Sequence, residues 1–217
     1  MRVVPLGGRG YDCNLFLLKD PGANAYDLVD AGVGHDHERI LAEVGRVVDP
    51  RRVQRVAVTH EHFDHTGGLP RWKELGARIY TSAATADKLR AGHDVTSAQF
   101  GHDLPTLEPD GVVGEGDHLP LGGVDVAVLE TRGHSPGSVC YWHEDSGTLF
   151  SGDTVFSQGG IGRFDFPDGD VRELYESVLR LERLPVRALH CGHGGSVEGD
   201  TARESLALSA RHVASCI

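Results

Sequence analysis

The chain has 217 residues, with 21 Lys and Arg residues against 32 Asp and Glu residues, and therefore a formal net charge of −11 at pH 7. This acidic balance disfavours nucleic acid as a partner, because a phosphate backbone binds to basic surfaces. The content of 39% hydrophobic and 24% charged residues is typical of a folded globular protein. No apolar run approaches the roughly 20 residues that span a bilayer, and residues 1–5 lack the apolar stretch of a signal peptide. We therefore expect no membrane association and a cytoplasmic location.

The first half of the chain alternates short apolar runs, typical of strands, with helical patterns. Its first predicted helix has Ile40 and Val44 at helical spacing and ends before Pro50. A polar stretch over residues 92–116, which contains two prolines, predicts a long surface loop or lid. In chain order the expected elements are strands at 13–19 and 25–30 joined by a turn at 21–22, a helix at 36–48, a strand at 53–58, a short helix, a strand at 78–81 and a helix at 85–91.

The second half predicts three strands, then a segment without periodicity, then a helix, a strand and a last helix. Asp170 is expected to cap the first of these helices, which ends at Pro185. The expected ranges are strands at 124–131, 138–143 and 148–151, an aperiodic segment at 154–169, a helix at 171–184, a strand at 186–190 and a helix at 201–214. The order ββαβα and then βββαβα predicts an α/β fold in which two sheets pack face to face with helices on the outer faces. We expect a single domain over residues 1–217.

The strongest signal for function is the run His60-x-His62-x-Asp64-His65, directly after a predicted buried strand. In extended backbone, residues i and i+2 point to the same side, so His60 and His62 can hold one ion together. Where the chain turns toward the next helix, Asp64 and His65 can be aimed at a second point nearby. Imidazole nitrogens and carboxylate oxygens are ligands that divalent metal ions prefer. The run therefore predicts a metal site.

Three more residues of ligand type follow predicted strands, each in a tight turn that contains glycine. His134 lies in the turn GHSPG, Asp153 in SGDT and His193 in CGHGG. Glycine allows the backbone to approach closely at such turns. Together with the first run, these turns supply seven ligand-type residues on four loops at strand ends, a pattern that coincidence explains poorly.

These motifs resemble those of the metallo-β-lactamase-fold metallohydrolase superfamily, and in particular of its glyoxalase II-like branch. The resemblance rests on HxHxDH, GH[ST]PG, SGDT and GHG, and it runs in register from NLFLL at residues 14–18 to the final helix. It implies an αββα sandwich, with mixed sheets and a dinuclear site at one edge. The ligands that it implies are His60, His62 and His134 for one ion, Asp64, His65 and His193 for the other, and Asp153 as the bridge between them.

The resemblance also implies the cofactors and the chemistry. It implies two divalent metal ions, with zinc as the first expectation and iron or manganese as alternatives. A hydroxide that bridges the two ions would attack a small-molecule substrate, with Asp64 and Asp153 as the catalytic carboxylates. The expected reaction is hydrolysis of a thioester, as in hydroxyacylglutathione hydrolases, or of a related small ester. The GHSPG turn does not match the GxSxG elbow of serine hydrolases.

Residues 153–170 resemble the segment after the bridging aspartate in glyoxalase II-like thioesterases and in persulfide dioxygenases. This segment offers Phe156, Phe164 and Phe166 as apolar contacts for a substrate. It also offers one guanidinium, that of Arg163, which either binds a substrate carboxylate or pairs with a neighbouring aspartate. Both roles of Arg163 remain open at this point.

Other members of the superfamily are disfavoured or stay as alternatives. True metallo-β-lactamases usually place cysteine where this chain has Asp153. Full-length glyoxalase II enzymes add a C-terminal helical domain that holds much of the glutathione, whereas this chain ends 24 residues after His193, which puts glutathione recognition in doubt. A lactonase is one alternative. Another is a mononuclear iron persulfide dioxygenase with His60, His134 and Asp153 as ligands, and a third is a metal-binding protein without activity.

The remaining histidines receive structural interpretations. We expect His190 and Asp30 to support the metal ligands by hydrogen bonding, while His93 and His102 flank the predicted lid. The histidines expected in solvent are His35, His37, His118, His143 and His212. The sequence leaves the oligomeric state open, a homo-oligomer included.

Overall fold

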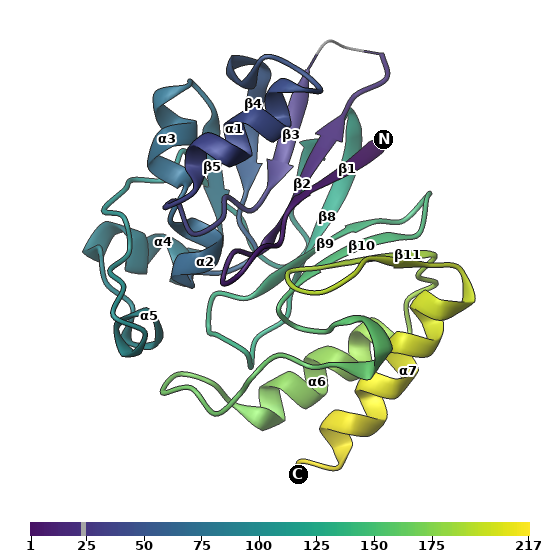
Figure 1. Cartoon of the computed structure of the whole chain (residues 1–217). Helices are drawn as coiled ribbons and strands as arrows, with labels where there is room; N and C mark the ends of the chain where they lie inside the picture. Colours follow the sequence, from purple (N-terminus) through teal and green to yellow (C-terminus); the bar gives the residue numbers. More distant parts are fainter. Residues whose placement is uncertain (23–24) are drawn as a thin grey trace.

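The structure, a computed structural model, describes residues 1–22 and 25–217 (Figure 1). Its first sheet has six strands in the order β1-β2-β3-β4-β5-β6, antiparallel from β1 to β3 and parallel from β3 onward. The predicted strands on either side of the turn at residues 21–22 are present; residues 23–24 lie outside the described part. The strands are β1 (Arg2–Gly7), β2 (Asn14–Lys19), β3 (Tyr26–Val29), β4 (Val53–Ala57), β5 (Arg78–Thr81) and β6 (Gly111–Val112).

The second sheet also has six strands, in the order β12-β11-β10-β9-β8-β7. It is mixed as well, because β10 and β11 run parallel while the other neighbours are antiparallel. Its strands are β7 (His118–Leu121), β8 (Val124–Glu130), β9 (Val139–His143), β10 (Thr148–Gly152), β11 (Ala188–Cys191) and β12 (Val197–Glu198).

Helices cover the outer face of each sheet. In Figure 1, α1 and α3 lie on one side of the strands and α6 and α7 on the other. The α6 helix begins after Asp170, whose carboxylate accepts hydrogen bonds from two backbone N–H groups, as the sequence predicts. The helices are α1 (His37–Gly45), α2 (Phe63–Thr66), α3 (Leu69–Glu74), α4 (Ala83–Ala91), α5 (Val95–Gln99), α6 (Val171–Glu182) and α7 (Asp200–Ala214), with 3-10 turns η1 (Pro50–Arg52) and η2 (Ser157–Gly159).

Three apolar clusters separate the four layers. Strand β2 shows how one strand serves two of them, since Leu15 and Leu17 face the helices α1 and α3 while Phe16 and Leu18 face the second sheet. The third cluster joins the second sheet to α6 and α7. The predicted αββα sandwich is therefore confirmed.

The prediction of a long loop or lid over residues 92–116 is wrong in part. The segment contains α5 and the edge strand β6, and the side chains of Leu104, Leu107 and Val113 are buried. These apolar residues have no regular spacing, so the sequence pattern does not indicate that they are buried. Only the part around α5 lies beside the site described below. In the described part of the chain, no helix has the length and apolar character needed to cross a membrane.

Candidate metal centre

The four segments that carry the candidate ligands meet at one edge of the sandwich. Each of them belongs to a connection that begins where a strand ends at that edge. Residues 60–65 follow β4, His134 lies in the turn between β8 and β9, Asp153 follows β10, and His193 follows β11. Strands β10 and β11 are parallel neighbours, so their carboxyl ends necessarily lie together. Backbone hydrogen bonds from Val139 N–H to the Thr59 carbonyl (2.8 Å) hold the two sheets together at this edge.

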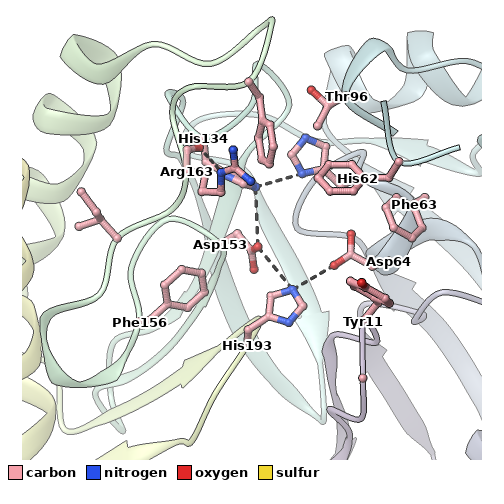
Figure 2. Close-up of a pocket in the computed structure, with 14 residues that line it drawn as sticks. Tyr11, His62, Phe63, Asp64, Thr96, His134, Asp153, Phe156, Arg163 and His193 are labelled. Atoms are coloured by element: carbon pink, nitrogen blue, oxygen red, sulfur yellow. Dashed lines mark hydrogen bonds and ion pairs between the residues drawn. The ribbon is translucent and has the colours of Figure 1, made fainter. Parts of the chain in front are cut away.

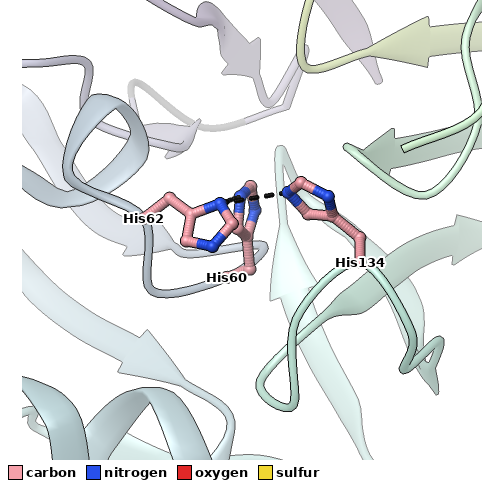
Figure 3. A group of neighbouring side chains, drawn as sticks. All are labelled: His60, His62 and His134. Carbon is pink, nitrogen blue, oxygen red and sulfur yellow. Dashed lines mark hydrogen bonds between the residues drawn. The ribbon is translucent and has the colours of Figure 1, made fainter. Parts of the chain in front are cut away.

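His60, His62 and His134 form a first group (Figure 3). The Nδ1 atom of His62 lies 3.1 Å from Nε2 of His60 and 3.0 Å from Nε2 of His134. All three rings are buried. Three ring nitrogens thus converge on one point, and two of them come from the predicted i, i+2 pair.

Asp64, His65 and His193 form a second group, and Asp153 lies between the two groups. Asp64 and His65 lie on the short helix α2, and Nε2 of His193 lies 3.0 Å from Oδ2 of Asp64. Oxygens of Asp153 lie 3.4 Å from His65 Nε2, 3.5 Å from His193 Nε2 and 3.7 Å from His134 Nε2. Figure 2 shows Asp153 between His134 and His193. The structure therefore brings all seven predicted ligand residues together.

Hydrogen bonds from neighbouring groups orient the rings. The Asp30 carboxylate lies 2.9 Å from Nδ1 of His65, and it accepts hydrogen bonds from the backbone N–H and the hydroxyl of Thr59. A carboxylate only accepts, so Nδ1 of His65 carries a proton and Nε2 points into the site, where it can bind an ion in place of a proton. In the same way, Nδ1 of His134 donates to the Arg163 carbonyl at 2.7 Å. The geometry agrees with the supporting role predicted for Asp30.

The pKa values of His134 and His65 are shifted in opposite directions, the first by burial and the second by neighbouring charges. Burial lowers the pKa of His134 to about 4, so this ring is neutral at pH 7. Burial also opposes the charged form of His65, but the carboxylates around it, Asp30, Asp153 and Asp64, outweigh burial and hold the pKa of His65 well above its ordinary value. Burial raises the pKa of Cys13 to about 12, so its thiol is neutral. The carboxylates around His65 therefore favour a positive charge in the second group, carried either by a proton or by a bound cation.

The residues fit a metal ion by their unpaired atoms and by the space between them. In the described residues, Nε2 of His65 and Oδ1 of Asp153 are buried without a hydrogen-bond partner, which costs free energy unless something compensates them. A Cβ atom on Gly192 would lie 2.1 Å from Oδ1 of Asp153 and 2.8 Å from the His65 ring. Glycine thus keeps this space open. Imidazole and carboxylate donors of this kind suit zinc, iron and manganese.

A cavity of about 350 Å³ opens onto both groups. Of the residues predicted to contact substrate, Phe156 and Arg163 line it, whereas Phe164 packs against the apolar cluster beneath α6 and α7. Phe166, from the same segment as Phe156, lines it as well. The sequence analysis did not place the other wall residues, which come from four separate segments. These residues are Tyr11, Phe63, Thr96, Phe100 and Ile161.

Two of the five histidines predicted to be exposed to solvent are buried. His37 is buried and packs edge-on against Trp72, and His143 is buried with Nδ1 bonded to the Ser146 hydroxyl. Both lie at the end of a helix or strand, where histidines are usually exposed, but the packing of neighbouring residues buries them here. His35, His118 and His212 are exposed as predicted.

The other histidines near the site occupy its surroundings. His190 is buried against Phe16 and Phe150, and its Nδ1 lies 2.9 Å from the Ser196 hydroxyl. It thereby ties down the loop that carries His193. His102 stacks on the outer side of Phe63, with ring centroids 4.1 Å apart, and His93 is exposed; neither lines the cavity.

A four-layer αββα sandwich with a His and Asp cluster at the strand ends defines a class of metal-binding proteins. The sequence profile of the Metallo-beta-lactamase superfamily matches residues 8–193. The chain belongs to this superfamily. Proteins with this fold use divalent metals, and one similar structure, TTHA1623, was solved in a di-iron-bound form; it has a TM-score of 0.74 and 28% sequence identity, and the match covers 96% of this chain and 97% of that one.

The similar proteins include some with a named activity and some without one. A protein of Aquifex aeolicus without assigned function is 33% identical over 198 residues, 89% of each chain. A hydroxyacylglutathione hydrolase of Rhodospirillum rubrum is 35% identical over 142 residues, which are 65% of this chain but 48% of that enzyme. A hydroxyacylglutathione hydrolase named GloC, of Haemophilus influenzae, is 29% identical and covered over 90% of its length. The chain thus spans about half the length of one such hydrolase and most of another. Among solved structures, the BLEG-1 B3 metallo-beta-lactamase has a TM-score of 0.79 and 26% identity, with 94% of this chain and 96% of that one covered.

Proposed function

We propose that this protein is a dinuclear metal-dependent hydrolase that cleaves a thioester or a related small ester. The observation that carries the proposal is the convergence of seven His and Asp side chains, five of which line one cavity, with Asp153 between two groups of three. The likeness to hydroxyacylglutathione hydrolases supports the reaction class.

In this proposal each group holds one divalent ion, and zinc is the expected metal, with iron or manganese as alternatives. His60, His62 and His134 would hold the first ion, Asp64, His65 and His193 the second, and Asp153 would contact both. When bound, such ions supply a nucleophile from water at neutral pH and stabilise negative charge that develops on a carbonyl oxygen.

The chain's own residues prepare the site for this chemistry. Hydrogen bonds to Asp30 and to the Arg163 carbonyl fix the ring orientations of His65 and His134 before any ligand binds. Asp64 lines the cavity, where its carboxylate can accept a hydrogen bond from an attacking water. Phe156 and Phe166 form apolar walls that limit the access of water to the reacting bond.

The test combines metal analysis with a panel of thioesters, lactones, phosphodiesters and persulfides. We expect about two metal ions per chain and hydrolysis of thioesters, with both lost in His134→Ala or Asp153→Ala. His118→Ala, which changes an exposed histidine paired with Asp125, is the control and should retain both. One iron per chain with oxygen consumption on a persulfide would instead assign a dioxygenase, and activity on lactones alone would assign a lactonase. A native protein without metal would exclude all three.

A further inference from the structure

The cavity beside the metal centre has an aromatic wall that nothing in the protein covers fully. Phe166 packs edge-on against His62 and His134, with ring centroids 5.5 and 5.9 Å apart, so the wall begins at the first ligand group. Phe100 continues it, at 5.8 Å from Phe166 and an interplanar angle of 81°. Figure 2 shows Phe156 and Tyr11 on other sides of the same cavity.

Much of this aromatic surface is in contact with solvent. Tyr11 and Phe100 leave 80% and 46% of their surface exposed, although both line the cavity. Exposed apolar surface gathered around a concave site is typical of a place where an apolar ligand is buried. Edge-to-face aromatic corners also give an aromatic ligand defined ring contacts.

Apart from the ions that the two ligand groups would hold, the cavity has little free positive charge to recognise an anion. Among the described residues that line it, Arg163 is the only lysine or arginine. Its guanidinium donates two hydrogen bonds to Asp165, at 2.9 and 2.8 Å, and lies 4.3 Å from the centroid of the Phe166 ring. A substrate carboxylate that bound the same Nε and Nη2 groups would have to displace Asp165, and the exchange of one exposed ion pair for another gains little affinity. The pairing thus follows the second of the two roles left open by the sequence.

We infer that the site selects substrates that carry an uncharged, apolar group of aromatic size beside the scissile bond, and that it discriminates against substrates recognised through carboxylates, such as glutathione conjugates. This inference rests on the proposed thioester or ester hydrolysis. Asp165 acts in it as a specificity-determining residue, because it pairs with the guanidinium of Arg163 at the cavity.

The experiment compares matched thioesters of N-acetylcysteamine on the zinc-loaded protein. We expect kcat/KM for the phenylacetyl thioester to exceed that for the succinyl thioester at least tenfold, mainly through a lower KM, and to exceed that for phenylacetyl-glutathione. Phe166→Ala should reduce the preference for phenylacetyl over succinyl. Asp165→Asn frees Arg163 and should raise kcat/KM for the succinyl thioester several-fold relative to phenylacetyl. Asp49→Asn, which breaks an equally exposed pair with Arg51 far from the cavity, should leave the ratio unchanged.

A binding measurement separates this inference from the proposed function. Calorimetry would compare two thioethers that cannot be hydrolysed, S-(2-phenylethyl)- and S-(3-carboxypropyl)-N-acetylcysteamine. Tighter binding of the phenylethyl compound without hydrolysis of any thioester would support the aromatic site and overturn the proposed reaction. Hydrolysis with equal or better activity on succinyl or glutathione thioesters, unaffected by Asp165→Asn, would overturn the inference and leave the proposed reaction standing.

Discussion

Asp30 adopts a left-handed backbone conformation, with φ of 62°, at the end of β3. Aspartate and asparagine tolerate this region better than most residues. The conformation places both carboxylate oxygens against donors from Thr59 and His65, so one side chain fixes a ligand ring and the start of the metal-binding run.

We predict that Asp30→Asn lowers the affinity for metal about 10- to 100-fold, the usual cost of losing a group that orients a ligand. Asparagine keeps the backbone preference but offers one oxygen where Asp30 uses two, so a donor from Thr59 or His65 loses its partner. Competition against a chromophoric chelator measures the affinity. Asp145→Asn, at an exposed position, is the matched control. An unchanged affinity in the Asp30 variant would show that the ring orientation does not depend on this carboxylate.

The grouping of the candidate ligand residues was predictable from the sequence, whereas most of the cavity wall was not. His60, His134, Asp153 and His193 each follow an apolar run with a turn, and this repeated local pattern identifies them without knowledge of the fold. Phe100 has no such pattern, because its position depends on how α5 packs beside the site. Local sequence thus identifies the candidate ligands, and tertiary packing determines what surrounds them.

At the scale of elements, the two longer strands that the sequence analysis missed share one feature. Strand β1 contains Pro5 and strand β7 contains Pro120, and each is the outermost strand at one end of its sheet. Proline lacks the N–H that an inner strand needs, so it is tolerated at sheet edges, where one side of the strand forms no ladder. Alternation interrupted by proline therefore indicates an edge strand as readily as a loop. The missed strands β6 and β12 are two residues each, too short to show a pattern.

Lys88 on α4 forms ion pairs with three separate segments, one of which is the His and Asp run at residues 60–65. Its ammonium group donates to Glu61 at 2.8 Å, to Asp94 at 2.7 Å and also to Asp168. Glu61 belongs to the metal-binding run, Asp94 caps α5, and Asp168 lies in the loop after Asp153. The side chains of Glu61 and Asp94 are fully buried, so they depend on this cation.

We predict that Lys88→Met destabilises the protein by about 3 kcal/mol, because it leaves buried carboxylates without their cation. The control is Lys73→Met, at a half-exposed lysine paired with Asp110 near the surface, which should cost about 0.5 kcal/mol. Urea unfolding followed by circular dichroism measures both values. Equal losses in the two variants would mean that the buried position of Lys88 has no special weight.

The same network predicts an acid-sensitive contribution from Asp94. Burial opposes ionisation of Asp94, but hydrogen bonds from Lys88 and Ser97 outweigh it and lower the pKa of the carboxyl group. A carboxyl whose pKa is lower in the folded state stabilises the protein above its unfolded pKa, and the contribution is lost as pH falls through the folded value. Asp94→Asn keeps an N-cap side chain for α5 but removes the charge. The substitution should lower the free energy of unfolding by about 2 kcal/mol at pH 7. The difference in free energy of unfolding between variant and parent protein should become smaller as the pH is lowered below about 4. Urea titrations at several pH values measure this, and a difference independent of pH would contradict it.

At the scale of the whole molecule, the candidate metal centre lies where the two halves of the chain meet. The Tyr141 hydroxyl of the second sheet donates to the Val58 carbonyl of the first at 2.8 Å. Asn14 on β2 donates to the carbonyls of Cys191 and Gly194, on either side of the loop that bears His193. Ligand residues come from both halves as well. A bound ion would therefore connect the two sheets in addition to the apolar layer between them.

We predict that metal binding raises the midpoint of thermal unfolding and that residues 1–217 unfold in one transition. At a free zinc concentration about 100 times the dissociation constant, binding to the folded state alone adds about 2.7 kcal/mol. For a chain of this size, that corresponds to a rise of about 5–10 °C. Scanning calorimetry of zinc-loaded and chelator-treated protein measures the shift. His118→Ala should show the full shift, whereas His193→Ala, which removes a ligand from the second half, should show a smaller one. Two separate transitions, one for each half, would contradict the single domain, and an unchanged midpoint after chelation would contradict an ion that connects the sheets.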